Sequence, residues 1–555
     1  MAGRNEETMI TNLPQIDIQR STFGSKSHRH LMTANAADLN IIYAEEYLPG
    51  DTCKMNLASL IREQTPIHPT MDNLVADIYF FSIPRRLTWT HFRNLMGEND
   101  TSYWEEENEY EIPQVTSPEG TGWAKGTLAD QLGIRQGVSG LSIDAQYLRS
   151  YCLCFNEWFR DENLVEPLNC PKDDVTVAGS NGTDQTDDCI KGGYPAKVAK
   201  LHDVFTSALP EPQKGPDTLI PMGTEAPVVG NGLTLGLTDG DDHFGGLYQK
   251  EHVTNQPILT AGTHSYGENA GDTTQGSYAF GTESLGVTKD PKNSGLVADL
   301  SIAQAATVNQ LRQAFAVQRM YEKDARGGTR YTELIRSHFN VMSPDARQQR
   351  PEYLGGKRIS LNMTEVVQTS STDATSPQGN VSGMSKTIDS DFMFEHSFTE
   401  HGILLGLMCI RNENSYSQGV ERKFLRKGKL DFYWPALAHI GEVGIKNIEI
   451  YAQGTSEDDE IFGYQEKDYE YRYSKNLITG EFSPDYATSL DSWHYGDDYP
   501  ELPTLSQEWI TSSKTNVDRT LAVQDQDQFL CDFYFNEEWT RPMPMHGVPG
   551  LIDHY

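Results

Sequence analysis

The stretch Leu74-Val-Ala-Asp-Ile-Tyr-Phe-Phe-Ser-Ile83 is rich in β-branched and aromatic residues, and Pro84 ends it. A continuous apolar run of this composition predicts a buried β-strand. It is the longest of several strand signals in the chain, and these signals together decide the fold class.

The other strand signals lie far from this stretch in both directions. Leu39–Tyr47 predicts a strand that the turn residues of Leu48–Asp51 close. Gly402–Cys409 predicts a buried strand, and Phe529, Cys531, Phe533 and Phe535 repeat with the period of two that marks a half-buried one. Strands scattered over hundreds of residues, with long loops between them, predict an all-β-dominated fold: a β-sandwich of jelly-roll type with a few helices.

Two segments change to a helical period. From Ser142 to Phe159 large apolar residues recur every four positions. A second helix is predicted after Thr307-Val-Asn-Gln310, which has the spacing of a capping box, and Gly327-Gly328 supplies its end. We expect both helices to pack against a sheet.

The segment from about Pro216 to Ser294 is rich in Gly, Thr, Asn and Asp and poor in large hydrophobic residues. We interpret it as one surface insertion, and Asp373–Ser385 as an exposed loop. The predicted organisation is an N-terminal arm (1–38), a first part of the jelly roll with a helical insertion (39–215), the surface insertion (216–294), the remainder of the jelly roll with its loops (295–540) and an extended C-terminal tail (541–555).

The charge of the chain limits its partners. With 45 Lys and Arg against 79 Asp and Glu, its formal net charge is −34. A protein that grips nucleic acid with its whole surface is usually basic, so any such contact must be local or carried by a basic partner. Mutual repulsion between copies should make assembly depend on salt.

Nothing in the sequence predicts secretion or a membrane span. The first fifteen residues are polar, and the apolar run Ile403–Ile410 is too short to cross a bilayer. The seven cysteines form no C-x-x-C pair, which favours buried, reduced thiols in a cytoplasmic protein.

No catalytic, cofactor or metal motif is present, so we predict no catalytic residues, no cofactor and no metal. Asp239–Asp242 resembles the start of a calcium loop, but the residues after it break the pattern. His202, Asp203 and Ser207 are the residue types of a hydrolytic triad, yet triad members usually converge from distant parts of a chain. We interpret their proximity as coincidence.

Two basic clusters stand out from the acidic background. They are candidates for phosphate contact, with one phenylalanine able to stack on a base. The alternative is a solvated strand and turn whose cations offset neighbouring carboxylates. The candidate DNA-binding residues are Lys26 and Arg29 in the N-terminal arm, and Arg422, Lys423, Phe424, Arg426, Lys427 and Lys429.

Several blocks along the chain resemble the major capsid protein of gokushoviruses, a branch of the microviruses. The blocks follow the order of that family and span nearly the whole chain. They are Leu48–Asp51, Thr65–Asn73, Phe80–Leu87, Phe155–Asp161, His202–Gly215, Asp324–Glu333 with Ile335–Phe339, Tyr433–Glu442 and Arg541–Tyr555.

The resemblance implies an eight-stranded antiparallel jelly roll with long loop insertions. It also implies a bacteriophage capsid protein that is part of the virion and lies in the bacterial host cytoplasm during assembly. Sixty copies would form a T = 1 icosahedral shell around a circular single-stranded DNA genome. The implied partners are other copies, the packaged DNA, a small basic DNA-binding protein and an unknown host receptor. Residues 216–294 occupy the place of the insertion that meets the host in relatives.

The C-terminal tail combines proline and glycine with apolar residues, which predicts a rigid extended segment. Such a tail can bury surface on a neighbouring subunit without a core of its own. The candidate interface residues are Arg541, Pro542, Met543, Pro544, Met545, Val548, Leu551 and Tyr555.

An alternative class is a carbohydrate-binding or glycan-cleaving β-sandwich, which shares Gly-rich loops and exposed aromatics, for which Trp493 and Tyr495 are the candidates. Cleavage would need two carboxylates at a fixed separation on rigid strands. The acidic residues here crowd into loops such as Glu457–Glu460 instead.

Overall fold

The structure is a computed structural model. It describes residues 18–24, 26–99, 110–216, 218, 307–370, 372, 377–511 and 514–547, with short strands at 228–230, 236–238, 244–246, 286–287 and 296–298. The chain divides into two compact units, Met1–Lys214 with Glu322–Tyr555, and Gly215–Tyr321.

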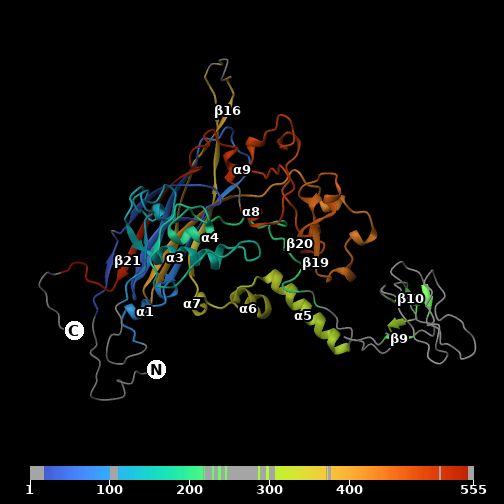
Figure 1. The fold of residues 1–555 in the computed structure, drawn as a ribbon. Coiled ribbons are helices and arrows are strands. Elements are labelled where there is room, and N and C mark those ends of the chain that lie inside the picture. The colour runs from blue at the N-terminus through green and yellow to red at the C-terminus, as the bar shows by residue number, and fades with distance from the viewer. Residues whose placement is uncertain are drawn as a thin grey trace, which may run out of the picture. The chain divides into compact units, whose positions relative to one another are not determined.

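The first unit contains two main antiparallel sheets (Figure 1). Strands pair in a nested way along the chain: β2 with β21, β3 with β18, β4 with β17 and β5 with β14. This nesting is the connectivity of a jelly roll, so the predicted all-β, jelly-roll-like fold is confirmed. The strands of the first sheet follow the order β14 (Glu352–Leu361), β5 (Leu74–Pro84), β18 (Gly402–Asn412) and β3 (Asn40–Tyr47). The strands of the second sheet follow the order β2 (His28–Ala34), β21 (Phe529–Arg541), β4 (Thr52–Glu63) and β17 (Thr387–Ser397). The short strand β1 (Ser21–Phe23) pairs with the end of β21.

The strands β5 and β18 are buried on both faces, which explains their continuous apolar sequences. In β18, Leu404 and Met408 belong to the core between the two sheets. Leu405 and Leu407 belong to a second core on the opposite face of the same sheet. By contrast β21 alternates, with Phe533 fully buried and Tyr534 half exposed, because only one of its faces meets the core.

The second core is built around α3 (Ala145–Cys154), which continues into a π-helical turn at Phe155–Phe159. The predicted helix therefore exists, but it begins at Ala145 rather than at Ser142. Ser142–Asp144 instead forms β7, which pairs with β6 (Gln114–Thr116), and the Asp144 side chain caps the helix. The neighbouring short elements are α1 (Phe92–Leu95), α2 (Leu128–Gln131), β8 (Val177–Ala178) and α4 (Gln185–Asp188).

The second predicted helix is α5 (Val308–Gly327). Its capping box is confirmed, since the Gln310 N–H donates to the Thr307 hydroxyl at 3.2 Å and the Thr307 N–H donates to Gln310 Oε1 at 2.8 Å. The helix ends at the predicted glycine pair, where Gly328 adopts a φ of +87°. Ala325 is the one buried residue of α5, and near the end of the helix Arg326 pairs with Glu442.

The corner between α5 and α6 (Tyr331–Phe339) is clamped onto the π-helical turn by Arg330. Its guanidinium donates to the backbone oxygens of Asn156 (2.7 Å) and Arg160 (2.8 Å). It also pairs with Glu162 and Glu333, each at 3.0 Å. The blocks Phe155–Asp161 and Asp324–Glu333 of the sequence resemblance therefore contact each other in one structural junction. The short helix α7 (Asp345–Gln348) follows α6.

A two-stranded hairpin joins the two main sheets between β14 and β17 and projects away from them in Figure 1. Its strands are β15 (Met363–Val367) and β16 (Val381–Ser385). The prediction of one exposed loop over Asp373–Ser385 is therefore wrong for its last five residues, which pair with β15. Gly383 is required there, because a Cβ would lie 2.6 Å from the Pro66 ring.

The long connection from β18 to β21 contains β19 (Glu442–Lys446), β20 (Ile461–Glu466), α8 (Gln507–Ile510) and α9 (Lys514–Asp518). All seven cysteines are free thiols, and six of them are buried, as predicted. Among the described residues no helix has the length and apolar character needed to span a membrane.

In the second unit the described strands form two small antiparallel sheets. One pairs β9 (Val228–Gly230) with β13 (Leu296–Ala298), and the other contains β10 (Gly236–Thr238), β11 (Phe244–Gly246) and β12 (Gly286–Val287). Most of the predicted insertion, 216–294, lies outside the described residues.

Candidate nucleic-acid and assembly surfaces

The second basic cluster lies between β18 and β19. Arg422–Phe424 and Lys429–Asp431 are short 3-10 turns. The Asp431 side chain accepts hydrogen bonds from the backbone N–H groups of Lys427 and Gly428, both at 2.7 Å. These bonds lower the pKa of Asp431 and hold the turn that carries the lysines.

Two of the five cations in this cluster are used inside the subunit. Arg422 donates to the Gly444 carbonyl oxygen at 3.0 Å and lies over the Tyr469 ring. Arg426 pairs with Glu470 at 3.1 Å. Both guanidinium groups therefore stabilise the segment itself, and they are poorly placed to contact a phosphate.

The three lysines differ from these arginines. Lys427 and Lys429 are exposed and make no ion pair with any described residue. The Lys429 ammonium lies 4.8 Å from the centre of the Trp434 ring. Lys423 pairs with Glu421, although it remains half exposed. The two unpaired lysines are the cations that this cluster leaves free for a polyanion.

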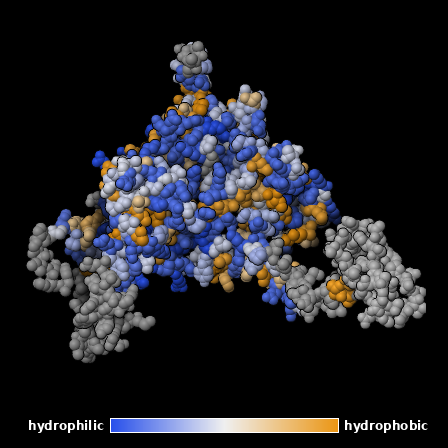
Figure 2. Space-filling view, in the orientation of Figure 1, coloured by the Kyte–Doolittle hydropathy of each residue, from blue (hydrophilic) through white to orange (hydrophobic). Residues whose placement is uncertain are grey.

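Exposed aromatic rings surround the lysines. Phe424 is 72% exposed. Arg426 lies between the Phe432 and Tyr471 rings, at 5.0 and 4.8 Å, which joins the rings into one area. Figure 2 shows hydrophobic residues gathered on the side of the molecule where β19 and β20 lie. We name the area the basic–aromatic surface, comprising Lys423, Phe424, Lys427, Lys429, Phe432, Tyr433, Trp434, Tyr471 and Tyr473, all of them exposed.

Sequence reasoning found the cations of this surface but missed most of its aromatic residues. Phe432-Tyr433-Trp434 directly follows the basic run, and three consecutive aromatics at that place were the available signal. Tyr471 and Tyr473 carried no signal, because only the fold brings them beside residues forty positions earlier.

A small cavity of about 80 Å³ lies beside this surface. Phe205, Arg422, Tyr469 and Lys475 are among its lining residues. The Lys475 ammonium donates to the Glu449 backbone oxygen at 3.0 Å, and burial lowers the pKa of Lys475. The polar groups of the cavity are thus largely satisfied by the subunit itself.

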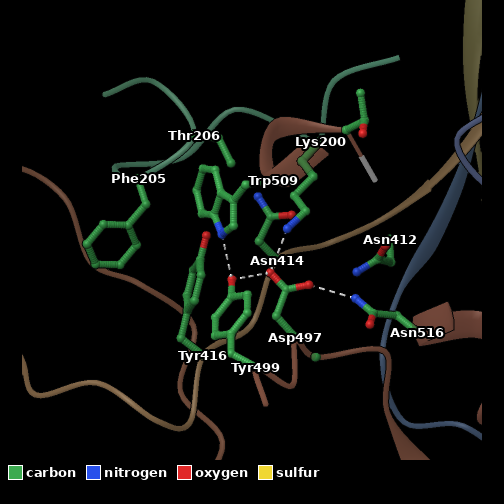
Figure 3. Close-up of polar contacts among 12 residues, drawn as sticks. Lys200, Phe205, Thr206, Asn412, Asn414, Tyr416, Asp497, Tyr499, Trp509 and Asn516 are labelled. Atoms are coloured by element: carbon green, nitrogen blue, oxygen red, sulfur yellow. Dashed lines mark hydrogen bonds and ion pairs between the residues drawn. The ribbon is translucent and has the colours of Figure 1, made fainter. Parts of the chain in front are cut away.

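A buried polar network anchors the segment that carries this surface (Figure 3). Lys200 pairs with Asp497 at 2.8 Å, and the same carboxylate accepts bonds from Tyr499 (2.7 Å) and Asn516 (2.6 Å). The Trp509 indole N–H donates to the Tyr499 hydroxyl at 3.1 Å. The network joins the end of the 39–215 segment to the connection between β18 and β21.

The residues that resembled a hydrolytic triad have structural roles. Asp203 accepts hydrogen bonds from the Thr206 backbone N–H at 2.9 Å and from the Tyr416 hydroxyl at 2.7 Å. The Ser207 hydroxyl donates to the backbone oxygen of Asp203, and not to His202. The arrangement therefore lacks the serine–histidine contact that a triad requires.

The calcium-loop candidate, Asp239–Asp242, lies outside the described residues. Within the described part of the chain, no group of three or more His, Cys, Asp or Glu side chains is placed to hold a metal ion.

The first basic cluster lies at β2 and is engaged with carboxylates. Arg29 forms a bidentate pair with Asp532, both distances being 2.5 Å, and this pairing raises the pKa of Arg29. Lys26 pairs with Glu45 and lies over the Trp539 ring. Lys26 and Arg29 therefore each have a carboxylate partner within the subunit.

The C-terminal tail begins where β21 ends. Arg541 is held by its own subunit, since its guanidinium donates to the Glu46 backbone oxygen at 3.1 Å and lies over the Trp539 ring. Beyond the half-buried Pro542, residues 543–547 are all exposed. Of the remaining interface candidates, Met543, Pro544 and Met545 lie in this exposed part, whereas Val548, Leu551 and Tyr555 lie outside the described residues.

Comparison with known proteins agrees with this architecture. The profile of a family described as "Capsid protein (F protein)" matches residues 11–551. The chain is 38% identical to the capsid protein VP1 of Bdellovibrio phage phiMH2K over the full length of both. It is 38% identical to VP1 of Spiroplasma virus 4 over 94% of each chain, and 37% identical to VP1 of Chlamydia phage 1 over 99% of each.

Proposed function

The chain belongs to the F protein family of phage capsid proteins, and from this premise we propose that sixty copies build a T = 1 shell around a circular single-stranded DNA genome. It is a structural protein of the virion and not an enzyme. The family assignment also confirms the resemblance to the gokushovirus capsid proteins.

We further propose that the basic–aromatic surface is where the subunit contacts the packaged DNA. The observation that carries this proposal is the position of Lys427 and Lys429 among exposed rings, where neither forms an ion pair with a described residue, in a chain of net charge −34. Ammonium groups bind phosphates with release of counterions, and aromatic faces stack on bases of any sequence. The first cluster is the weaker candidate because both of its cations already pair with carboxylates.

Binding of a fluorescent oligothymidylate to the full-length chain tests this proposal. The variant Lys427→Glu/Lys429→Glu should bind at least tenfold more weakly, and the slope of log affinity against log salt should become shallower by about 1.4, since each phosphate contact on a single strand contributes about 0.7. Trp434→Ala should weaken binding by roughly 1–3 kcal/mol through lost stacking.

The matched control is Lys54→Glu/Lys172→Glu, which reverses two exposed cations elsewhere. Equal affinity of the lysine variant and the control would remove DNA contact from this surface. A larger loss from Arg29→Gln than from the lysine variant would transfer the proposal to the first cluster.

A small basic DNA-binding protein is proposed as a second partner. Sixty copies at −34 bring roughly two thousand negative charges around a polyanion, and this repulsion must be offset.

Electron microscopy of the purified chain, with and without single-stranded DNA, tests the shell itself. Closed particles of uniform size are expected, and persistent monomers even after co-expression with the basic protein would refute the shell.

We also propose that residues 216–294 meet the host. Their loop-like composition supports this, and so does their place in the second compact unit, 215–321. An epitope inserted in 247–285 should bind its antibody on intact particles, and the antibody should block adsorption. An epitope that is hidden on intact particles would contradict the proposal.

A further inference from the structure

Helix α5 has an exposed face that carries four cations and one large aromatic side chain. Arg312, Phe315, Arg319, Lys323 and Arg326 follow one another at spacings of three and four residues, which places them on one side of the helix. Arg312, Arg319 and Lys323 are exposed, and Phe315 is 65% exposed. We call these five residues the α5 stripe.

The side chains of this stripe are mainly exposed. Arg312, Arg319 and Lys323 have no ion-pair partner among the described residues. Two further apolar residues of the helix are exposed as well, Val308 at 63% and Met320 at 46%. An isolated helix is only marginally stable in water, and most helices in proteins are stabilised by packing of an amphipathic face.

The C-terminal end of the same stripe shows which chemistry fits it. Arg326 pairs with Glu442 and lies 3.6 Å from Glu466, on the adjacent strands β19 and β20. The Glu442 side chain is almost fully buried in this contact. One residue of the stripe therefore already binds carboxylates that belong to this chain.

We propose that the α5 stripe docks on the acidic surface of a second copy of this chain. Charge complementarity favours this occupant, because the chain carries 79 acidic residues and a net charge of −34, whereas α5 has four cations and two carboxylates. A protein surface also covers Phe315, Val308 and Met320, which a phosphate backbone would leave in water. The inference rests on the self-assembly that the family implies, and it names one contact that the assembly uses.

The test compares particle formation by the wild-type chain and two charge-reversal variants. Arg312→Glu/Arg319→Glu/Lys323→Glu should lower the yield of closed particles at least tenfold, measured by sedimentation and electron microscopy. Its unfolding transition should match that of the wild type, because the changed side chains are exposed. Arg135→Glu/Lys172→Glu/Lys54→Glu, which reverses three exposed cations elsewhere, should retain the wild-type yield.

A second measurement identifies the occupant directly. A photoreactive benzophenone amino acid in place of Phe315 should give a protein adduct of twice the subunit mass within wild-type-like particles. Adducts with DNA, normal assembly of the triple variant, or equal losses in both variants would each overturn the inference. Failure of the wild-type chain to form particles would instead refute the shell on which the inference depends.

Discussion

Glu63 shows how burial changes the chemistry of one residue. The residue is 6% exposed, and the Tyr495 hydroxyl lies 3.0 Å from both of its carboxylate oxygens. The expectation that Tyr495 is exposed is therefore wrong, because its ring is buried against this carboxyl group. Burial raises the pKa of Glu63 to about 7, against the effect of its hydrogen bonds with Tyr495 and Thr520. Near neutral pH this end of β4 therefore contains a carboxyl group close to its point of ionisation.

The stability of the subunit should depend on pH through this group. Between about pH 4.5 and 7 the folded state keeps a proton that the unfolded state has released, so the free energy of unfolding falls as pH rises through this window. The loss amounts to about 3 kcal/mol. Urea unfolding from pH 5 to 8 should show a flatter dependence for Glu63→Gln than for the wild type, and an unchanged slope would contradict it. The exposed Glu501→Gln is the control.

Lys200 and Asp497 form the charged centre of the buried network. Burial opposes ionisation of Asp497, but Lys200 and two further hydrogen-bond donors hold its pKa below the usual range. Both side chains are 7% exposed, so the pair lies in a region of low dielectric.

Lys200→Met should destabilise the subunit by about 3 kcal/mol, because it leaves a buried carboxylate without its cation. Adding Asp497→Asn should recover part of this loss, because the double variant contains no buried charge at this position and Tyr499 and Asn516 can donate to the amide oxygen. The measurement is urea unfolding, with the exposed Lys197→Met as control. If Lys200→Met were as stable as the wild type, the ion pair would make no net contribution to the free energy of unfolding.

At the scale of elements, the corner between α5 and α6 depends on a single side chain. Arg330 reaches two backbone oxygens and two carboxylates, and its planar guanidinium suits this set better than an ammonium group. The corner also favours glycine, since position 328 has a φ of +87°, a backbone conformation that residues with a Cβ rarely adopt.

Arg330→Lys should loosen α6 and lower stability by roughly 2 kcal/mol through lost charge-assisted hydrogen bonds. Amide hydrogen exchange over Tyr331–Phe339 should become faster. Arg336→Lys changes an exposed arginine of the same helix and should leave exchange unaltered. Equal exchange in both variants would mean that packing alone holds the corner.

At the scale of the whole molecule, the charge of −34 opposes association of copies. Raising salt shortens the Debye length to about 8 Å at 0.15 M and screens this long-range repulsion more than the short contacts at an interface. Particle yield, followed by light scattering, should therefore increase from low to physiological salt. A yield that falls steadily with salt would show that attraction between opposite charges dominates assembly.

The C-terminal tail belongs to the same scale, because its proposed partner is another copy. Deletion of His546–Tyr555 should leave a folded subunit that assembles poorly, since residues 543–547 already extend from the end of β21 with exposed side chains. Circular dichroism checks the fold and electron microscopy checks the particles. Normal particle yield would remove the tail from the interface.

The sequence by itself determined the features that arise from local geometry. The apolar run of β5, the alternation of β21 and the capping box of α5 follow from the periods of strands and helices, and each was predicted from neighbouring residues. The family was also identified from the sequence, because its motifs are contiguous blocks.

Only the tertiary structure decided which groups meet. Arg29 pairs with Asp532 across 503 positions because β2 and β21 are the outermost pair of the nested strands. The same topology pairs Lys26 and Arg29 of the first basic cluster with carboxylates. The fold beyond β18 places Lys427 and Lys429 beside aromatic rings, without an ion pair to any residue that the structure describes. A periodic pattern specifies that one face of an element will be covered, but the partner is set by contacts between distant segments, and for a capsid protein that partner can be another copy.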